Sequence, residues 1–136
     1  MNRRHFLSAL GAASLIPVVA QAAGFKDYSP GVIETALEEG KTVFVDFSAT
    51  WCSTCKRQER VITALRAKAP AYDAAMEFVK VEWDTYKSQE EAVFRSIPRR
   101  STLIVLKGDD ELGRLVAGTS EKQIKALMDK GLEAAG

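Results

Sequence analysis

Two cysteines, Cys52 and Cys55, are the residues of this 136-residue chain most able to do chemistry, and two residues separate them. They lie where an apolar, β-branched run that predicts a buried strand ends and a helical pattern begins. A thiol at the start of a helix faces unpaired amide groups and the positive end of the helix dipole, so its thiolate is stabilised and its pKa falls. We therefore predict that Cys52 is a nucleophile that forms a mixed disulfide with a substrate, and that Cys55, one helical turn later, resolves it.

The cysteine pair could also be half of a zinc site or a structural disulfide. Beyond residue 22 the chain has no histidine and no third cysteine, so a zinc ion would lack further ligands of the usual kind. A bridge across two residues closes almost no loop and therefore removes little entropy from the unfolded chain. We predict a redox-active disulfide between Cys52 and Cys55, with no metal and no bound cofactor.

The elements that must position this pair alternate along the chain. Apolar runs predict strands, and apolar residues at spacings of three and four predict helices between them. Ser29 and Ser88 are expected to cap helices, and Ser120 with Gln123 forms a capping-box pattern. This order predicts an α/β sheet covered by helices. Strands are expected at residues 42–48, 77–83, 102–106 and 112–117, and helices at residues 30–39, 56–68, 88–94 and 120–132.

The first 22 residues predict a cleavable signal peptide, in which a basic stretch and an apolar run precede small residues that end at Ala22. The pair Arg3 and Arg4 before two apolar residues also resembles a twin-arginine signal, with the general secretory route as the alternative. The apolar run is interrupted and shorter than the ~20 residues that a spanning helix needs, so no stable membrane insertion is expected after cleavage. Cleavage after Ala22 would leave residues 23–136 as one domain in the periplasm.

The composition fits an ordinary globular domain, because 46% of the residues are hydrophobic and 27% are charged. Without Arg3 and Arg4, 17 of the 19 basic residues remain against 18 acidic residues, which gives a net charge of −1. A nearly neutral domain has no excess of positive charge for a polyanion. Nucleic acid is therefore not an expected partner.

Residues 43–56 and 102–132 resemble thioredoxin, in particular its exported forms and the C-terminal domain of the disulfide reductant DsbD. The motif that carries this resemblance follows a Val-Asp-Phe strand and reads Trp51-Cys52-Ser53-Thr54-Cys55-Lys56. The resemblance implies a thioredoxin fold over residues 23–136, with a central mixed sheet of about four strands flanked by helices. It also implies an activity in dithiol–disulfide exchange.

The same resemblance implies roles for three further residues. Asp46 falls at the buried acid behind the family's second cysteine, Lys80 at the lysine that commonly neighbours this acid, and Trp51 at the wall of the site. An unpaired carboxylate in a buried strand should have a raised pKa, so we expect Asp46 to be the proton acceptor for Cys55. The alternatives are that Asp46 is merely paired within the sheet and that Lys80 lies on a solvent face.

The chain departs from the family in the loop before the strand that starts at Thr102. Thioredoxins carry a cis-proline there, whereas this sequence has Ser101, and its nearest proline is Pro98. In the family this loop pairs with the substrate backbone, which implies substrate binding by Arg100, Ser101 and Thr102. We expect a trans bond before Ser101, because a cis bond there would cost about 3 kcal/mol. The basic pair Arg99-Arg100 indicates a preference for acidic partners, unless these are simply solvated charges.

The residues between the cysteines bear on the direction of the reaction. Strong oxidants of the DsbA type resemble one another in a histidine there, whereas Ser53 and Thr54 carry no charge that would stabilise a thiolate. We therefore expect a reductase of disulfide-containing periplasmic proteins, and the resemblance implies a membrane electron donor of the DsbD or CcdA type. A disulfide-donating oxidase and a Cu(I)-binding copper-delivery module are the alternatives, because two thiolates also suit Cu(I). Sco-like copper proteins add a distal histidine, which residues 23–136 lack.

Overall fold

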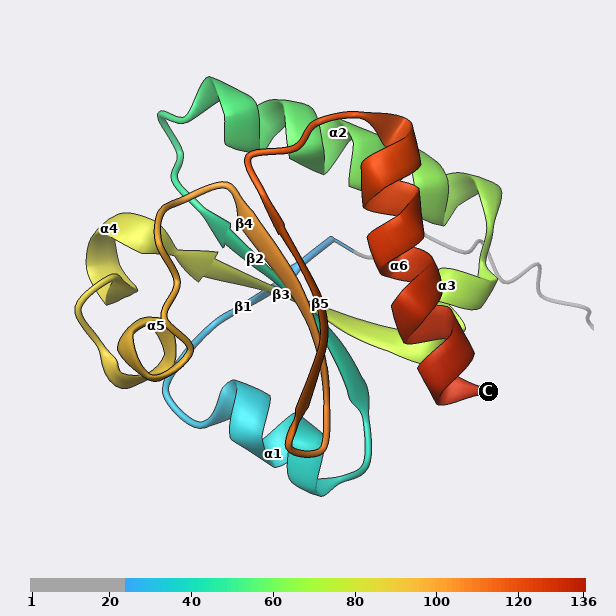
Figure 1. The fold of residues 1–136 in the computed structure, drawn as a ribbon, viewed down its shortest axis with the longest axis horizontal. Coiled ribbons are helices and arrows are strands. Elements are labelled where there is room, and N and C mark those ends of the chain that lie inside the picture. The colour runs from blue at the N-terminus through green and yellow to red at the C-terminus, as the bar shows by residue number, and fades with distance from the viewer. Residues whose placement is uncertain (1–23) are drawn as a thin grey trace, which may run out of the picture.

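The structure is a computed structural model, and it describes residues 24–136. The predicted signal peptide, residues 1–22, lies outside the described residues. Helices and strands are interleaved along the described chain, with two successive strands before the last helix (Figure 1). In chain order they are β1 (Lys26–Asp27), α1 (Val32–Glu38), β2 (Thr42–Ser48), α2 (Ser53–Lys68), α3 (Ala71–Ala75), β3 (Met76–Glu82), α4 (Trp83–Tyr86), α5 (Glu90–Phe94), β4 (Thr102–Lys107), β5 (Asp110–Val116) and α6 (Glu121–Ala135).

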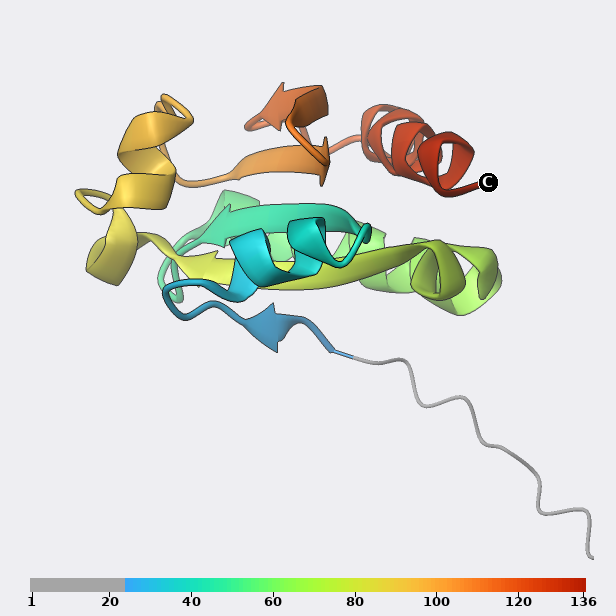
Figure 2. The same cartoon turned by 90° about the horizontal axis from the view of Figure 1, so that it is seen from below.

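The strands of the described chain form one five-stranded mixed sheet in the order β1-β3-β2-β4-β5, which Figure 2 shows from edge to edge. β1, β3 and β2 are parallel, whereas β4 is antiparallel to β2 and β5 is antiparallel to β4. The mixed α/β sheet is confirmed, but the expected count of about four strands was one too low. β1 escaped prediction because it has only two residues, both exposed, which is too short for any periodic pattern.

β2 runs through the middle of the sheet, and all seven of its residues are buried. Because successive side chains of a strand point to opposite faces, β2 contributes to both halves of the core. Helices α1, α4 and α5 lie on one face, and α2, α3 and α6 lie on the other (Figures 1 and 2). The first half of the core includes Ile33, Val43, Val45, Phe47, Val79, Val81 and Ile104, and the second includes Phe44, Ile62, Phe78, Leu103, Val105, Ile124 and Met128.

Of the three serines expected to cap helices, only one does so in the structure. Ser29 and Ser88 do not cap, because the N-cap positions of α1 and α5 fall later in the chain and carry no side-chain cap hydrogen bond. Ser120 caps α6 as predicted, since its Oγ accepts a hydrogen bond from the N–H of Gln123 at 3.1 Å. A serine near a helix start therefore caps only where the backbone brings the amide within reach.

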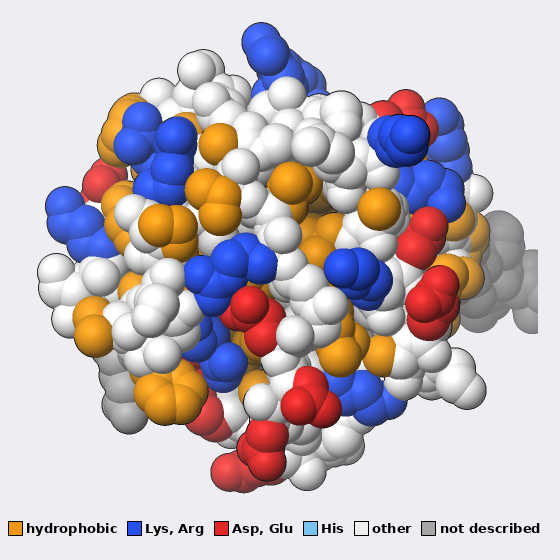
Figure 3. All heavy atoms as spheres, viewed as in Figure 1, with side chains coloured by type: hydrophobic (Ala, Val, Ile, Leu, Met, Phe, Trp, Pro, Cys, Tyr) orange, Lys and Arg blue, Asp and Glu red, His pale blue; other side chains and the backbone are white. Residues whose placement is uncertain are grey.

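The surface mixes charges of both signs. On the face seen in Figure 3, Lys and Arg side chains alternate with Asp and Glu side chains among scattered apolar ones. Within residues 24–136, every helix is too short or too polar to cross a membrane.

Candidate active site

Cys52 occupies the N-cap of α2, at the turn that follows β2. Its Sγ accepts a hydrogen bond from the N–H of Cys55 at 3.2 Å, and its own N–H donates to the carbonyl oxygen of Ala49 at 3.1 Å. Because sulfur takes the place of the usual capping oxygen, α2 begins at Ser53, three residues earlier than predicted. The two thiols are not linked to each other, and only 3% of Cys52 and 1% of Cys55 is exposed.

The two sulfurs differ in acidity. Burial opposes ionisation of Cys52, but hydrogen bonds from the side chain of Cys55, from Ser101 and from the backbone N–H of Cys55 outweigh it and lower the pKa of Cys52 to about 7. Burial and the contact with Cys52 raise the pKa of Cys55. At neutral pH a large fraction of Cys52 is therefore thiolate, while Cys55 keeps its proton.

Asp46 is fully buried in β2, and neither of its carboxylate oxygens has a hydrogen-bond partner among the described residues. Lys80 lies directly across from it in β3, as the resemblance implied, but the Nζ of Lys80 binds the carboxylate of Glu59 at 2.8 Å. Burial raises the pKa of Asp46 to about 7; the charge of Lys80 opposes this shift, whereas the charges of Glu59 and Cys52 add to it. Asp46 is therefore not ion-paired, and it titrates in the range where it can exchange a proton at neutral pH.

The side chain of Ser101 is directed at both cysteines. Its Oγ lies 3.2 Å from the Sγ of Cys52 and 3.1 Å from the Sγ of Cys55, and the residue is fully buried. Residues 24–136 contain no cis peptide bond, so the bond before Ser101 is trans as predicted, and Ser101 has a φ of 65°. Proline could not replace it in this conformation, because the proline ring fixes φ near −65°.

The backbone of Ser101 is occupied inside the fold. Its N–H donates to the carbonyl oxygen of Phe47 at 2.7 Å, and its carbonyl oxygen accepts from the N–H of Ala117 at 2.9 Å and from Nε2 of Gln58 at 3.0 Å. Neither group is available to pair with a substrate backbone in this conformation. The expected substrate contact through Ser101 is therefore replaced by contacts within the chain, which no local sequence pattern indicates.

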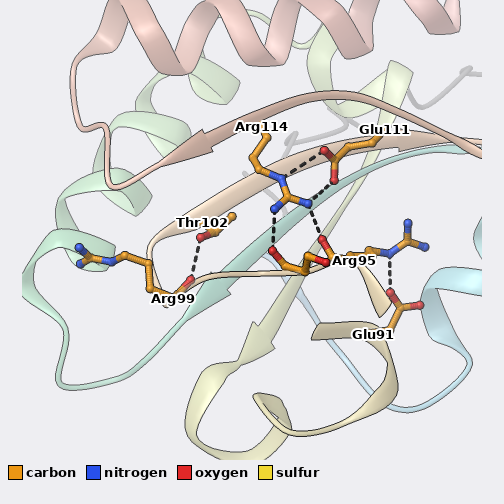
Figure 4. Close-up of polar contacts among 7 residues, drawn as sticks. Glu91, Arg95, Arg99, Thr102, Glu111 and Arg114 are labelled. Carbon is orange, nitrogen blue, oxygen red and sulfur yellow. Dashed lines mark hydrogen bonds and ion pairs between the residues drawn. The ribbon is translucent and has the colours of Figure 1, made fainter. Parts of the chain in front are cut away.

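The loop before β4 is fixed from both ends, as Figure 4 shows. Arg114 in β5 donates hydrogen bonds to the carbonyl oxygens of Arg95 at 2.6 Å and Ser96 at 2.9 Å. The Oγ1 of Thr102 donates to the carbonyl oxygen of Arg99 at 2.7 Å, and Thr102 is fully buried. The side chain of Thr102 therefore holds the loop rather than facing a substrate.

Trp51 and Arg100 form the open side of the site. Trp51 is 57% exposed, and its Nε1 donates to a carboxylate oxygen of Asp84 at 2.6 Å. The guanidinium of Arg100 lies 4.3 Å from the centre of the indole ring, within range of a cation–π contact, and it also lowers the pKa of Cys52. Trp51 precedes Cys52 in the chain and is held by Asp84 and Arg100, and its role as a wall of the site remains a prediction. Asp84, which holds the ring of Trp51, could not be predicted because it is 33 residues away in the chain.

The comparisons with known proteins identify the family. The Thioredoxin family model matches residues 28–130. The chain belongs to the thioredoxin family. Thioredoxin H5 from Oryza sativa subsp. japonica is 30% identical over 65% of this chain and 62% of the rice protein, so the chain spans less than two thirds of that relative. Thioredoxin from Echinococcus granulosus is also 30% identical, over 76% of this chain and 90% of its own length. The crystal structure of Trxlp from Edwardsiella tarda is 34% identical, covers 74% of this chain and 96% of its own, and gives a TM-score of 0.65.

Thioredoxins are thiol:disulfide oxidoreductases that act through a Cys-x-x-Cys pair, and the family assignment confirms the resemblance to thioredoxin that the motif indicated. Among residues 24–136, no three His, Cys, Asp or Glu side chains are grouped so that they could hold a metal ion. The chemical groups that this site presents are the two thiols and the residues that set their protonation.

Proposed function

We propose that this thioredoxin-family protein is a thiol:disulfide oxidoreductase that reduces disulfides of exported proteins. The observation that carries the proposal is the contrast between the two buried sulfurs. Cys52, at the N-cap of α2, has a pKa of about 7, whereas the pKa of Cys55 is raised. One sulfur is therefore ready to attack at neutral pH while the other keeps its proton for a later step.

The reaction consists of two thiol–disulfide exchanges. The thiolate of Cys52 attacks one sulfur of the substrate disulfide; a bond between Cys52 and that sulfur forms, and the second substrate sulfur leaves as a thiolate that takes a proton from water. Asp46 accepts the proton of Cys55, whose thiolate then attacks the Sγ of Cys52 and releases the first substrate sulfur as a thiolate. Two electrons pass to the substrate, and the protein is left with a Cys52–Cys55 disulfide.

The open side of the site supports binding of partners with acidic segments. Arg100 lies against the exposed ring of Trp51, beside Cys52, so a client disulfide that reaches this sulfur passes a cation and an apolar surface. Such a surface favours a carboxylate or an aromatic side chain near the client cysteine.

Export and re-reduction complete the proposal. The basic, apolar and small-residue order of residues 1–22 supports export, and a membrane electron donor of the DsbD or CcdA type would then restore the dithiol. When the full chain is expressed in a bacterial host, N-terminal sequencing of the periplasmic fraction is expected to give Ala23 as the first residue. Recovery of the chain with an intact Met1 in the cytoplasm would contradict the export step.

The direction of the reaction is tested by the reduction potential of the Cys52/Cys55 pair in residues 23–136. Because the pKa of Cys52 is about 7, close to the thioredoxin value and far above the ~3.5 of DsbA, we expect a potential near −270 mV. Equilibration against glutathione or dithiothreitol buffers measures it. A potential near −120 mV would mean that the protein donates disulfides, and the proposed direction would then be wrong.

A further inference from the structure

The two exchanges proposed for Cys52 and Cys55 assign no step to the buried hydroxyl of Ser101. We propose that Ser101 is a positioning residue whose single O–H stabilises whichever of the two sulfurs is the thiolate, first Cys52 and then Cys55. The geometry behind this is the position of Oγ, 3.2 Å from one sulfur and 3.1 Å from the other. The effect of the Ser101 hydroxyl on catalysis rests on the proposed function, whereas its effect on the pKa values of the thiols does not.

In the reduced protein the hydroxyl can serve both sulfurs at once. A thiolate at Cys52 accepts a hydrogen bond from the O–H of Ser101, and the S–H of Cys55 is shared between the Sγ of Cys52 and the Oγ of Ser101. Hydrogen bonds to a charged acceptor are about twice as strong as neutral ones. Because Ser101 is fully buried, water does not compete for these contacts in this conformation.

The same hydroxyl is in place for the second exchange. Once Cys52 is bonded to a substrate sulfur, its own sulfur carries no charge. The hydrogen bond from the O–H of Ser101 to that sulfur is therefore weaker. When Asp46 takes the proton of Cys55, the charge moves to a sulfur that already lies 3.1 Å from the Oγ of Ser101. Turning the O–H from one sulfur to the other then stabilises the new thiolate without any movement of the backbone.

The surrounding chain holds Ser101 in the conformation that this role requires. Its φ of 65° is unusual for a residue with a Cβ, and such a conformation persists only where neighbouring contacts enforce it. The hydrogen bonds of its backbone to Phe47 in β2, Gln58 in α2 and Ala117, just after β5, do so from three separate parts of the fold. The hydroxyl is thereby fixed between the sulfurs, in the place where a proline would offer no donor.

The proposal is tested with Ser101→Ala and Ser101→Gly, which both remove the hydroxyl. Glycine accepts a positive φ without strain, so this second variant keeps the test valid if alanine disturbs the loop. The pKa of Cys52, followed by thiolate absorbance, is expected to rise from about 7 by about one unit. At pH 7 the rate at which iodoacetamide alkylates Cys52 should then fall about fivefold. At a pH above the Cys52 pKa of both the wild type and the variant, the two proteins should be alkylated at the same rate.

Thr102→Val is the matched control for thiol acidity. It removes a hydroxyl from the next residue, the first of β4, which donates to the carbonyl oxygen of Arg99 rather than to a sulfur. The pKa of Cys52 should stay at about 7 in this variant. An unchanged pKa in both Ser101 variants would overturn the proposal, and so would an equal shift in Thr102→Val, because loop position rather than the hydroxyl would then be responsible.

This outcome is separable from that of the proposed function. If the wild-type protein proves to be a disulfide donor, the role of Ser101 in thiolate stabilisation is still decided by the titration of Cys52 in the wild type and the Ser101 variants. If the wild type reduces disulfides and the Ser101 variants titrate like it, only the inference about Ser101 fails.

Discussion

Cys52→Ser is expected to lower the rate of disulfide reduction by at least about 10³-fold, because a serine hydroxyl does not ionise near neutral pH and is a poor nucleophile towards sulfur. Cys55 cannot take over, since its pKa is raised and its sulfur therefore keeps its proton at neutral pH. Insulin reduction with dithiothreitol as electron source, followed by turbidity, measures the loss. Because the variant keeps the volume of the side chain nearly unchanged, its unfolding transition should remain close to that of the wild type.

Cys55→Ser is the matched variant that separates the two sulfurs. Attack by Cys52 should still occur, but the mixed disulfide should persist, because no second thiol is present to resolve it. Mass spectrometry under non-reducing conditions is expected to show one substrate chain joined to Cys52. Trapping through Cys55 in the Cys52→Ser variant, or full turnover in either variant, would contradict the assignment of nucleophile and resolving cysteine.

Asp46→Asn is expected to stabilise the protein by about 2–4 kcal/mol near pH 8 and by much less near pH 4. The pKa of Asp46 rises from an ordinary 3.8 to about 7 on folding, so the native state binds more protons than the unfolded chain between these values. The free energy of unfolding of the wild type therefore falls as the pH rises from about 4 to about 7, and it stays low at higher pH. The amide carries no charge and escapes this penalty.

Urea unfolding of both proteins at the two pH values tests this effect. Asp110→Asn is a suitable control, because Asp110 also lies in a strand but is exposed, and its change should alter stability little at either pH. The prediction would be wrong if both variants raised the free energy of unfolding equally, or if the effect of Asp46→Asn did not grow with pH. Either result would mean that ionisation of the buried Asp46 does not destabilise the fold.

The same Asp46→Asn variant should be slower in the second exchange, because Cys55 loses its proton acceptor. Single-turnover experiments are expected to show accumulation of the mixed disulfide at neutral pH, with the rate recovering as the pH rises towards the pKa of Cys55. A rate of resolution equal to that of the wild type at pH 7 would remove Asp46 from the mechanism while leaving the stability prediction intact.

The sequence alone determined the reacting groups and the elements that carry them. The Cys52/Cys55 spacing, the apolar run of β2 and the helical pattern of α2 are all local, and strand and helix periodicities are read within short windows. The motif around the cysteines then indicated the family, and through it the positions of Asp46 and Lys80, which the structure places directly opposite each other.

Only the tertiary structure decided how these groups interact. β1, α3 and α4 are too short to show a period, and they form because the rest of the fold offers them partners. Lys80 binds Glu59, which leaves Asp46 unpaired, because the packing of α2 against the sheet brings that carboxylate within reach. Ser101 meets the sulfurs across at least 46 residues of chain. A hydrogen bond between residues so far apart depends on the register and packing of several elements, and no local pattern of residues encodes it.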